Sequence, residues 1–379
     1  MRSALSAAPS VAPSGARAAR IAIYCPSLPP ERGGVADHTA LLARALAETG
    51  ADVVVLGRTG NAVRGVETVL GVTALGEHGL AASAARARSG FVLVQYVPFL
   101  YARFGLAPSL LMGLRALRGA GVRIGLFVHE PYVPFTRLPW LLTGWPMRWQ
   151  LRALARVSDI VCASVPAFLE AAGAPLHEDA RRLLLPVGST LPVAPGSRAG
   201  ARATLGLDAS EIAVGVFSPG ASGLRRDWLA QAASALRDQP VRWVFFGRNA
   251  ETPPPAFPAD VRSQCLGWLE PAKASEIFRA LDVAAQPFED GLTLRRTSAM
   301  AALAHGVPLV SSRGPLFDFT LEDAAVCAPT ADDFATDLAR LVETPALREA
   351  QGRRGGEFYV AHGSVEVAAA RLLAALGSG

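Results

Sequence analysis

The sequence predicts an α/β protein with two Rossmann-like domains that face each other across a cleft. The chain has 379 residues, enough for two domains with separate cores. Short apolar runs alternate with amphipathic helical stretches, as in parallel doubly wound sheets. A Pro-, Gly- and Ser-rich stretch at 191–207 separates an earlier alternating set from a later one, and we interpret it as the linker.

The first alternating set predicts an N-terminal domain over residues 20–190. Residues 1–19 contain no acidic side chain and are broken by Pro and Gly, so we expect a disordered tail. An amphipathic helix is expected at 35–50, between the first two strands. The strands are short apolar runs that fit burial on both faces. They are predicted at 21–25, 52–57, 91–96, 124–130, 159–164 and 182–188.

The second alternating set predicts a C-terminal domain over residues 191–364. Helices are expected between its strands, again as in a parallel sheet. A last amphipathic helix follows at 365–377. The strands of this domain are predicted at 212–218, 241–247, 262–267, 282–288 and 307–312.

Composition limits the class of protein. Apolar residues make up 51% of the chain, but no run reaches about 18 uninterrupted apolar residues, so we expect a soluble protein. The net charge of +5 is too small to indicate nucleic acid as a partner, although it suits anionic ligands. The four cysteines lie far apart without metal-ligand spacing, which predicts no metal site and free thiols in the cytoplasm.

Two stretches that combine Arg with apolar residues, 101–123 and 137–156, have two interpretations. They suit helices of the domain core. They also suit the face of a peripheral enzyme on anionic lipid, because the second stretch contains Trp140, Trp145 and Trp149. The second interpretation predicts weak contact with the inner face of a membrane.

In open α/β sheets, ligands bind in the loops that follow strands. Gly33 and Gly34 follow the first strand and open a helix, so they offer free N–H groups to an anion or form an ordinary tight turn. His129 ends a buried strand, where it binds an acceptor hydroxyl or a developing charge, or only packs. Arg225 and Arg226 follow a Gly-rich turn and form either a phosphate cradle or a solvated face.

A further helix is predicted over 294–305, with Thr293 as its cap. Arg295 and Arg296 then lie in its first turn, at the positive end of the helix dipole. Two cations there cost about 0.3–1 kcal/mol each unless an anion joins them. A diphosphate held by this loop, Thr293 included, would supply that anion. The alternative partners are the carboxylates just before them, Glu289 and Asp290.

Together these loops resemble the GT-B glycosyltransferases of family 4, the group 1 transferases. The resemblance covers nearly the whole chain from about Arg20. In the N-terminal half it rests on PERGGVADHTALLARALAETGADVVVL and VHEPYVP, and in the C-terminal half on GWLEPAKASEIFRALDVAAQPF and ALAHGVPLVSS. The order and spacing of these motifs, more than any one of them, indicate the family.

The resemblance implies an N-terminal acceptor domain and a C-terminal nucleotide-sugar domain, with the last helix, about 365–379, crossing back to the first domain. It implies a hexosyltransferase that moves a sugar from a nucleotide diphosphate sugar to a hydroxyl acceptor, usually with retention and without a cofactor or metal. The expected donor is a UDP- or GDP-sugar. The expected acceptor belongs to a polysaccharide, glycolipid or small-molecule glycoside pathway. A lipid-linked acceptor is one of these alternatives.

Particular residues match family positions. The resemblance implies that Gly33 and Gly34 lie near the donor diphosphate, and that His129 lines the sugar and acceptor site. Arg225 or Arg226 falls where a basic residue binds the diphosphate. The nucleotide-base region would be formed by Gly267, Trp268, Leu269 and Glu270.

The chain departs from the family at one motif. Family members usually carry two glutamates eight positions apart, and Thr293 and Ala301 stand at those positions here. Asp290 and Gly291 take the place of the first Glu-Gly pair, which makes Asp290 a catalytic candidate. We interpret the change as the mark of a subgroup without the paired glutamates.

Two other functions remain open from the sequence. A sugar-nucleotide epimerase on the same fold would convert the donor without an acceptor. A non-catalytic GT-B protein would bind a nucleotide sugar or a partner enzyme, and the missing glutamates favour this version.

Overall fold

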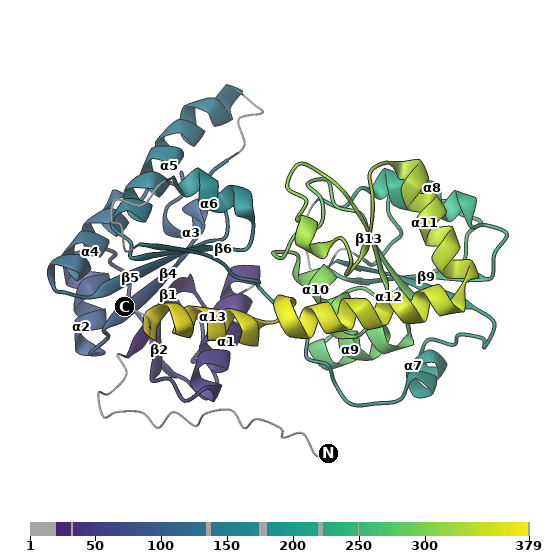
Figure 1. Ribbon diagram of the computed structural model, residues 1–379, viewed down its shortest axis with the longest axis horizontal. Helices are drawn as coiled ribbons and strands as arrows, with labels where there is room; N and C mark the ends of the chain where they lie inside the picture. The colour runs from purple at the N-terminus through teal and green to yellow at the C-terminus, as the bar shows by residue number, and fades with distance from the viewer. Residues whose placement is uncertain are drawn as a thin grey trace, which may run out of the picture.

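The computed structural model describes residues 20–31, 33–133, 138–173, 180–218, 223–248 and 250–377. It has two α/β domains, each built on a parallel sheet (Figure 1). The predicted fold class is confirmed. The last strand of the first sheet ends at 184, and the first strand of the second sheet begins at 212. Each domain is therefore nearly continuous in sequence.

The N-terminal sheet has seven strands in the order β3-β2-β1-β4-β5-β6-β7. Strand β1 lies inside the sheet and pairs with β2 and β4, so that Tyr24 lies opposite Leu56 and Val94. Both faces of these strands are buried, as their unbroken apolar runs predict. The strands are β1 (Ile21–Ser27), β2 (Val53–Thr59), β3 (Glu67–Val69), β4 (Phe91–Tyr96), β5 (Arg123–Val128), β6 (Ile160–Ala163) and β7 (Arg181–Leu184).

Helices cover both faces of this sheet. One face holds a core with α4 and α5, and the other a core with α1 and the chain's last helix. The helices of this domain are α1 (Gly34–Glu48), a π-helical turn η1 (Glu77–Ala81), α2 (Ala82–Arg86), α3 (Pro98–Tyr101), α4 (Pro108–Gly119), α5 (Leu138–Arg156) and α6 (Pro166–Ala172).

The C-terminal sheet has six strands in the order β10-β9-β8-β11-β12-β13. Its strands are β8 (Ile212–Ser218), β9 (Val241–Gly247), β10 (Ser263–Cys265), β11 (Val283–Gln286), β12 (Leu309–Ser312) and β13 (Val326–Ala328). The helical segments are α7 (Arg198–Thr204), α8 (Arg226–Ala235), α9 (Pro271–Ala280), α10 (Thr297–Ala304), η2 (Phe319–Leu321), α11 (Ala331–Glu343), α12 (Pro345–Phe358), η3 (Tyr359–Gly363) and α13 (Val365–Gly377).

The last helix returns to the N-terminal domain, as the resemblance implies (Figure 1). In α13, Ala368, Ala369 and Leu372 are fully buried in the same core as Ile23 and Phe91. By length and mean hydropathy alone, the run Pro345–Gly377 is sufficient to cross a membrane. Its α13 part instead behaves as the core helix of a globular domain, because its apolar face packs on α1.

Three features differ from the prediction. The short edge strands β3 and β13 were not expected, because three residues are too few to show a period. The stretch taken as a linker contains α7, whose Ser197 side chain accepts a hydrogen bond from the Gly200 N–H. The helix predicted to start at 294 starts at Thr297.

Candidate functional site between the domains

A cavity of about 440 Å³ lies between the two domains, beside the ends of several strands. Loops after β1 and β5 line it from the N-terminal domain, and the start of α10 lines it from the C-terminal domain. Of the residues predicted for the site, it brings together Gly33, Gly34, His129, Arg295 and Arg296. Their arrangement at the carboxyl edge is the one expected for a ligand site in an open parallel sheet.

The start of α1 faces this cavity. Gly33 is the N-cap residue and Gly34 the first helical residue, and no side chain caps the helix there. A Cβ atom added to either glycine would meet no atom within 4 Å, so open space lies above both. The N–H groups of a first helical turn have no intrahelical acceptor. This end of α1 therefore presents partial positive charge to the cavity.

The start of α10 lines the same cavity with Thr297 and Ser298. Its first helical bond runs from the Met300 N–H to the Arg296 carbonyl, and Arg296 occupies the N-cap position without a side-chain cap. Two helix N-termini from different domains thus border one cavity. Such an arrangement suits an anion with more than one charged group.

Arg295 and Arg296 precede α10, and both donate to the carboxylate of Asp290. The alternative predicted from the sequence, an ion-pair network, is therefore present. It does not use every donor of the two guanidinium groups, because the Nε atoms of both arginines are buried and have no hydrogen-bond partner among the described residues. Because one carboxylate is shared by two arginines, the cluster of Asp290, Arg295 and Arg296 has one net positive charge.

Both arginines are shielded from water. The guanidinium of Arg296 lies 4.4 Å from the ring centre of Phe288, and that of Arg295 lies 5.5 Å from the ring of Phe168 in the other domain. Burial lowers the pKa of Arg296 to about 10, and it also lowers the pKa of Arg295. Arg296 therefore stays charged at neutral pH, in a position where a second anion would be held strongly.

Four of the residues predicted for catalysis or for the diphosphate lie outside this cavity. Thr293 is fully buried and its hydroxyl has no partner, so it neither caps α10 nor reaches a ligand in this conformation. Arg225 stacks its guanidinium over Trp228 at 4.9 Å, and Arg226 is exposed at the start of α8. Asp290 stands behind the two arginines that it binds. The prediction that Thr293 caps the helix is wrong, because the chain makes a separate turn at 293–296 before α10 begins.

His129 belongs to a buried polar cluster that extends beneath the cavity. Its Nε2 atom lies 2.6 Å from Oε1 of Gln95, and its ring stacks on Phe127. His38 lies with its ring 4.9 Å from that of His129, and its side chain is buried beside Gln95. Burial lowers the pKa of His38 to about 4 and places that of His129 well below its usual 6.5. Both imidazoles are therefore neutral at pH 7 and available as hydrogen-bonding groups.

A second cavity of about 420 Å³ adjoins the first, because Asp37, Thr190 and Arg248 line both. Trp268 and Leu269, predicted for the nucleotide base, line this second cavity. The other two residues of that prediction, Gly267 and Glu270, do not line it. Gly267 instead holds the loop, since its carbonyl accepts from Gly247 and its N–H donates to Ala250.

Arg248 and Asp37 were missed by the sequence reasoning. Arg248 follows β9 directly, and its charge acts across the domains on Asp37 in the first turn of α1. The preceding Gly247 has φ +101°, and a Cβ atom there would lie 2.2 Å from the Ser218 carbonyl oxygen. The signal was present in the sequence, because a glycine and a cation at the carboxyl end of a strand mark the ligand edge.

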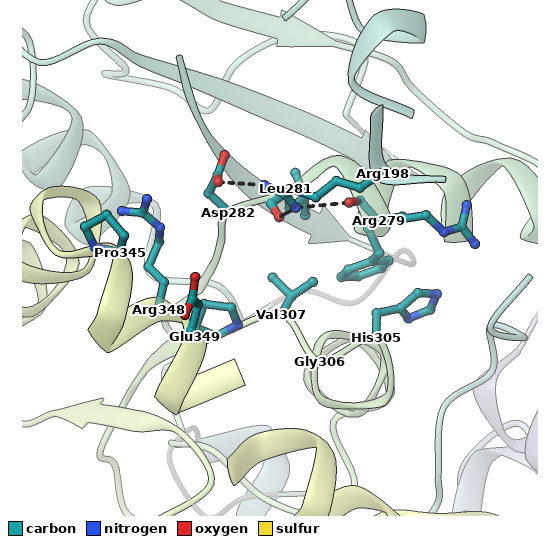
Figure 2. A pocket seen from close by; sticks show the side chains of 12 residues that line it. Arg198, Arg279, Leu281, Asp282, His305, Gly306, Val307, Pro345, Arg348 and Glu349 are labelled. Carbon is teal, nitrogen blue, oxygen red and sulfur yellow. Dashed lines mark hydrogen bonds and ion pairs between the residues drawn. The ribbon is translucent and has the colours of Figure 1, made fainter. Parts of the chain in front are cut away.

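A cavity of about 520 Å³ lies at the opposite end of the C-terminal sheet, next to the residues that precede β11 and β12 (Figure 2). Its polar groups already have protein partners. Arg198 donates to the Leu281 carbonyl and to Asp282, and His305 lies between Ser275 and the Ala301 carbonyl. Ligands in this fold bind at the other edge, so we assign this cavity no role.

The two parallel-sheet domains and the cavity between them have the arrangement of the GT-B fold. Residues 212–344 match the sequence model of the family described as glycosyl transferases group 1. The matched region holds β8 to α11, including the start of α10 and its arginines. The match and the fold support the predicted glycosyltransferase, and they do not support the epimerase alternative.

Solved structures with the same fold cover almost the whole chain. Sucrose-phosphate synthase from Thermosynechococcus elongatus has a TM-score of 0.69 at 18% identity, over 93% of this chain and 97% of that one. HepE from Anabaena, solved with UDP and glucose, has a TM-score of 0.69 at 14% identity, over 95% and 100%. WaaG, a glycosyltransferase involved in lipopolysaccharide biosynthesis, has a TM-score of 0.64 at 14% identity, over 95% and 100%. No curated protein matches the sequence significantly.

Proposed function

We propose that this chain transfers a hexose from a nucleoside diphosphate sugar to a hydroxyl acceptor in the interdomain cleft. One observation carries the proposal. The starts of α1 and α10 and the guanidinium groups of Arg295 and Arg296 surround a single cavity, in a chain whose C-terminal domain matches the group 1 transferases. Positive groups fixed where a diphosphate leaves stabilise its developing charge, which is usually the largest single contribution to such catalysis.

The two adjoining cavities separate the parts of the donor. The diphosphate lies in the first cavity, against Arg295 and Arg296, and the base of UDP or GDP lies in the second, against Trp268 and Leu269. The arginines and helix termini supply the positive charge that a bound cation supplies elsewhere, so we propose transfer without a metal. HepE, which shares this fold, was solved with UDP and glucose, and this supports a UDP-sugar as the first donor to test.

The acceptor enters from the N-terminal domain, where His129 faces the first cavity. In the step that we propose, the acceptor oxygen forms a bond to the anomeric carbon while the bond from that carbon to the phosphate oxygen breaks. The electron pair goes to the diphosphate, and the proton of the acceptor hydroxyl follows to a phosphate oxygen. We propose that bond formation and bond breaking occur on the same face of the sugar ring, so that the configuration of the anomeric carbon is retained. We also propose that the chain belongs to a family 4 subgroup in which Asp290 holds the two arginines.

A donor screen tests this function. Nucleotide sugars of UDP, GDP, ADP and dTDP are added to the full chain, and its thermal unfolding is followed. A donor at a hundred times its Kd adds about 2.7 kcal/mol to the stability of the folded protein. The donor found in this way is then incubated with hydroxyl acceptors, and the products are separated. If none of the four donors stabilises the protein, the proposal is overturned.

We propose a cytoplasmic polysaccharide or glycolipid pathway as the setting of this reaction.

A further inference from the structure

We propose that one face of the N-terminal domain docks on an anionic lipid membrane. This face, called here the α3–α5 face, is formed by α3, α4, α5 and the loop between α3 and α4. The docking does not depend on the proposed function. Its consequence, that the sugar acceptor is held in the membrane, rests on that function. The face is recognised by its exposed apolar side chains, which are Phe99, Phe104, Leu106, Met112, Trp145 and Trp149.

The exposure of these side chains is high for apolar residues. Phe104 is 69% exposed, Trp149 67% and Met112 64%. Half of the large apolar side chains that are exposed in the described part of the chain lie on the α3–α5 face. Scattered exposed apolar residues need no explanation, but a gathered group marks a protein or membrane contact. Tryptophan and phenylalanine are the side chains that favour the boundary between lipid headgroups and acyl chains.

The loop and helices that carry these side chains pack against one another. The loop that carries Phe104 is fixed to α5, because Gln150 donates to the Gly105 carbonyl at 3.0 Å and accepts from the Ala107 N–H at 2.6 Å. On α5, Trp145 and Trp149 are four residues apart and therefore share one side of the helix. Helix α4 contacts α5, and Figure 1 shows α5 extending beyond the rest of the domain.

Charge distinguishes a lipid surface from a protein partner. Residues 97–158 contain eight arginines and a single acidic residue, Glu130, whereas the whole chain has a net charge of only +5. The rest of the chain is therefore slightly acidic. On the α3–α5 face, Arg103 and Arg115 are exposed, and the guanidinium of Arg148 lies 5.8 Å from the ring of Trp145. Arginines beside exposed aromatic rings, with almost no acidic side chain nearby, suit anionic headgroups above an apolar layer.

The face leads directly into the cleft. Val97 lines the interdomain cavity, and α3 begins at the next residue, so Phe99 lies only two residues from the cavity lining. Both Val97 and His129 belong to the N-terminal domain, on the side where the acceptor enters. A membrane against this face would bring a lipid-held hydroxyl to the cleft without removing its acyl chains from the bilayer.

The test is co-sedimentation of the full chain with vesicles. One set is phosphatidylcholine alone, and the other contains about a third phosphatidylglycerol. We expect sedimentation with the anionic vesicles at low salt, and its loss at high salt or without phosphatidylglycerol. Replacing both Phe104 and Trp149 with serine should weaken binding at least tenfold. Replacing Arg103 and Arg115 with serine should weaken it about fivefold for each arginine removed.

Phe319→Ser is the matched control, because Phe319 is 71% exposed on the C-terminal domain. It should leave vesicle binding unchanged, and thermal unfolding should show that every variant is folded. The proposal is overturned if the wild-type chain does not sediment with anionic vesicles. It is also overturned if Phe319→Ser weakens binding as much as the aromatic pair, or if the aromatic pair changes only the oligomeric state. Because none of these readouts uses a donor, failure of the transferase assay would leave them interpretable.

Discussion

Replacing Asp290 is the most direct test of how charge is balanced in the cleft. Its carboxylate is shared by Arg295 and Arg296, which are 24% and 11% exposed, and it is itself 21% exposed. Asp290→Asn keeps the shape of the side chain and removes its charge. Two poorly hydrated cations then lie side by side without an ion-pair partner, and only the charges of Glu130 and Glu289 still act on them. Breaking a buried ion pair costs about 3–5 kcal/mol, and partial exposure reduces this, so we expect unfolding to become about 2–3 kcal/mol easier.

The same change should strengthen binding of a nucleoside diphosphate. The arginine cluster gains one unit of positive charge at about 5 Å from a bound phosphate, which is worth at most about 3 kcal/mol at an effective dielectric constant of 20. After screening, we expect UDP or GDP to bind about 10- to 100-fold more tightly, measured by calorimetry. The loss of unfolding free energy should therefore be largely restored at saturating nucleotide.

Glu289→Gln is the matched control, because this neighbouring carboxylate is exposed and its charge acts on Arg296 without an ion pair to either arginine. It should change both measurements far less. If Asp290→Asn leaves stability unchanged, or weakens nucleoside diphosphate binding, then Asp290 does not serve as the internal counter-ion of the cluster. Loss of nucleotide-sugar binding with unchanged diphosphate binding would indicate that Asp290 contacts the sugar, in line with its place as a catalytic candidate in the sequence.

Further variants test other parts of the site. Arg296→Ala should lower kcat/KM by an amount that corresponds to about 1.5–3 kcal/mol of lost transition-state stabilisation, the value of a hydrogen bond to a charged group. Arg226→Ala should change kcat/KM less than about twofold, because Arg226 is exposed outside the cavity. Gln95→Leu should raise KM for the acceptor more than for the donor, since it frees the ring of His129. The pKa of His38 is about 4 in the folded protein and 6.5 in the unfolded chain, so the folded state binds fewer protons between these values. The contribution of His38 to the free energy of unfolding is therefore complete above pH 6.5, and about 3 kcal/mol of it is lost as the pH falls towards 4. Unfolding of His38→Gln in denaturant should show a weaker dependence on pH over this range; an unchanged slope would place the titration elsewhere.

The fold was predictable because its strands are buried on both faces. Such strands read as unbroken apolar runs, and the predictions for β4, β8 and β9 match the structure residue for residue. The edge strand β3 was not found, because its three residues, Glu-Thr-Val, carry no such run. Local pattern also failed at the start of α10, where Thr293 is a favourable cap by residue type. Its burial beneath the loop depends on tertiary packing that the local sequence does not show.

In the candidate site, the sequence indicated the backbone features and left the side-chain partners open. Gly33 and Gly34 mark a helix start whatever surrounds them, and the structure places both on the cavity. Arg295 was singled out as a cation in an unfavourable position at a helix start. The sequence left two kinds of anion open for it, a bound diphosphate or a nearby carboxylate, and the structure pairs it with Asp290. This bears on the missing glutamates, because the acid of the proposed site, Asp290, binds both arginines and leaves the three residues together with one net positive charge for the donor.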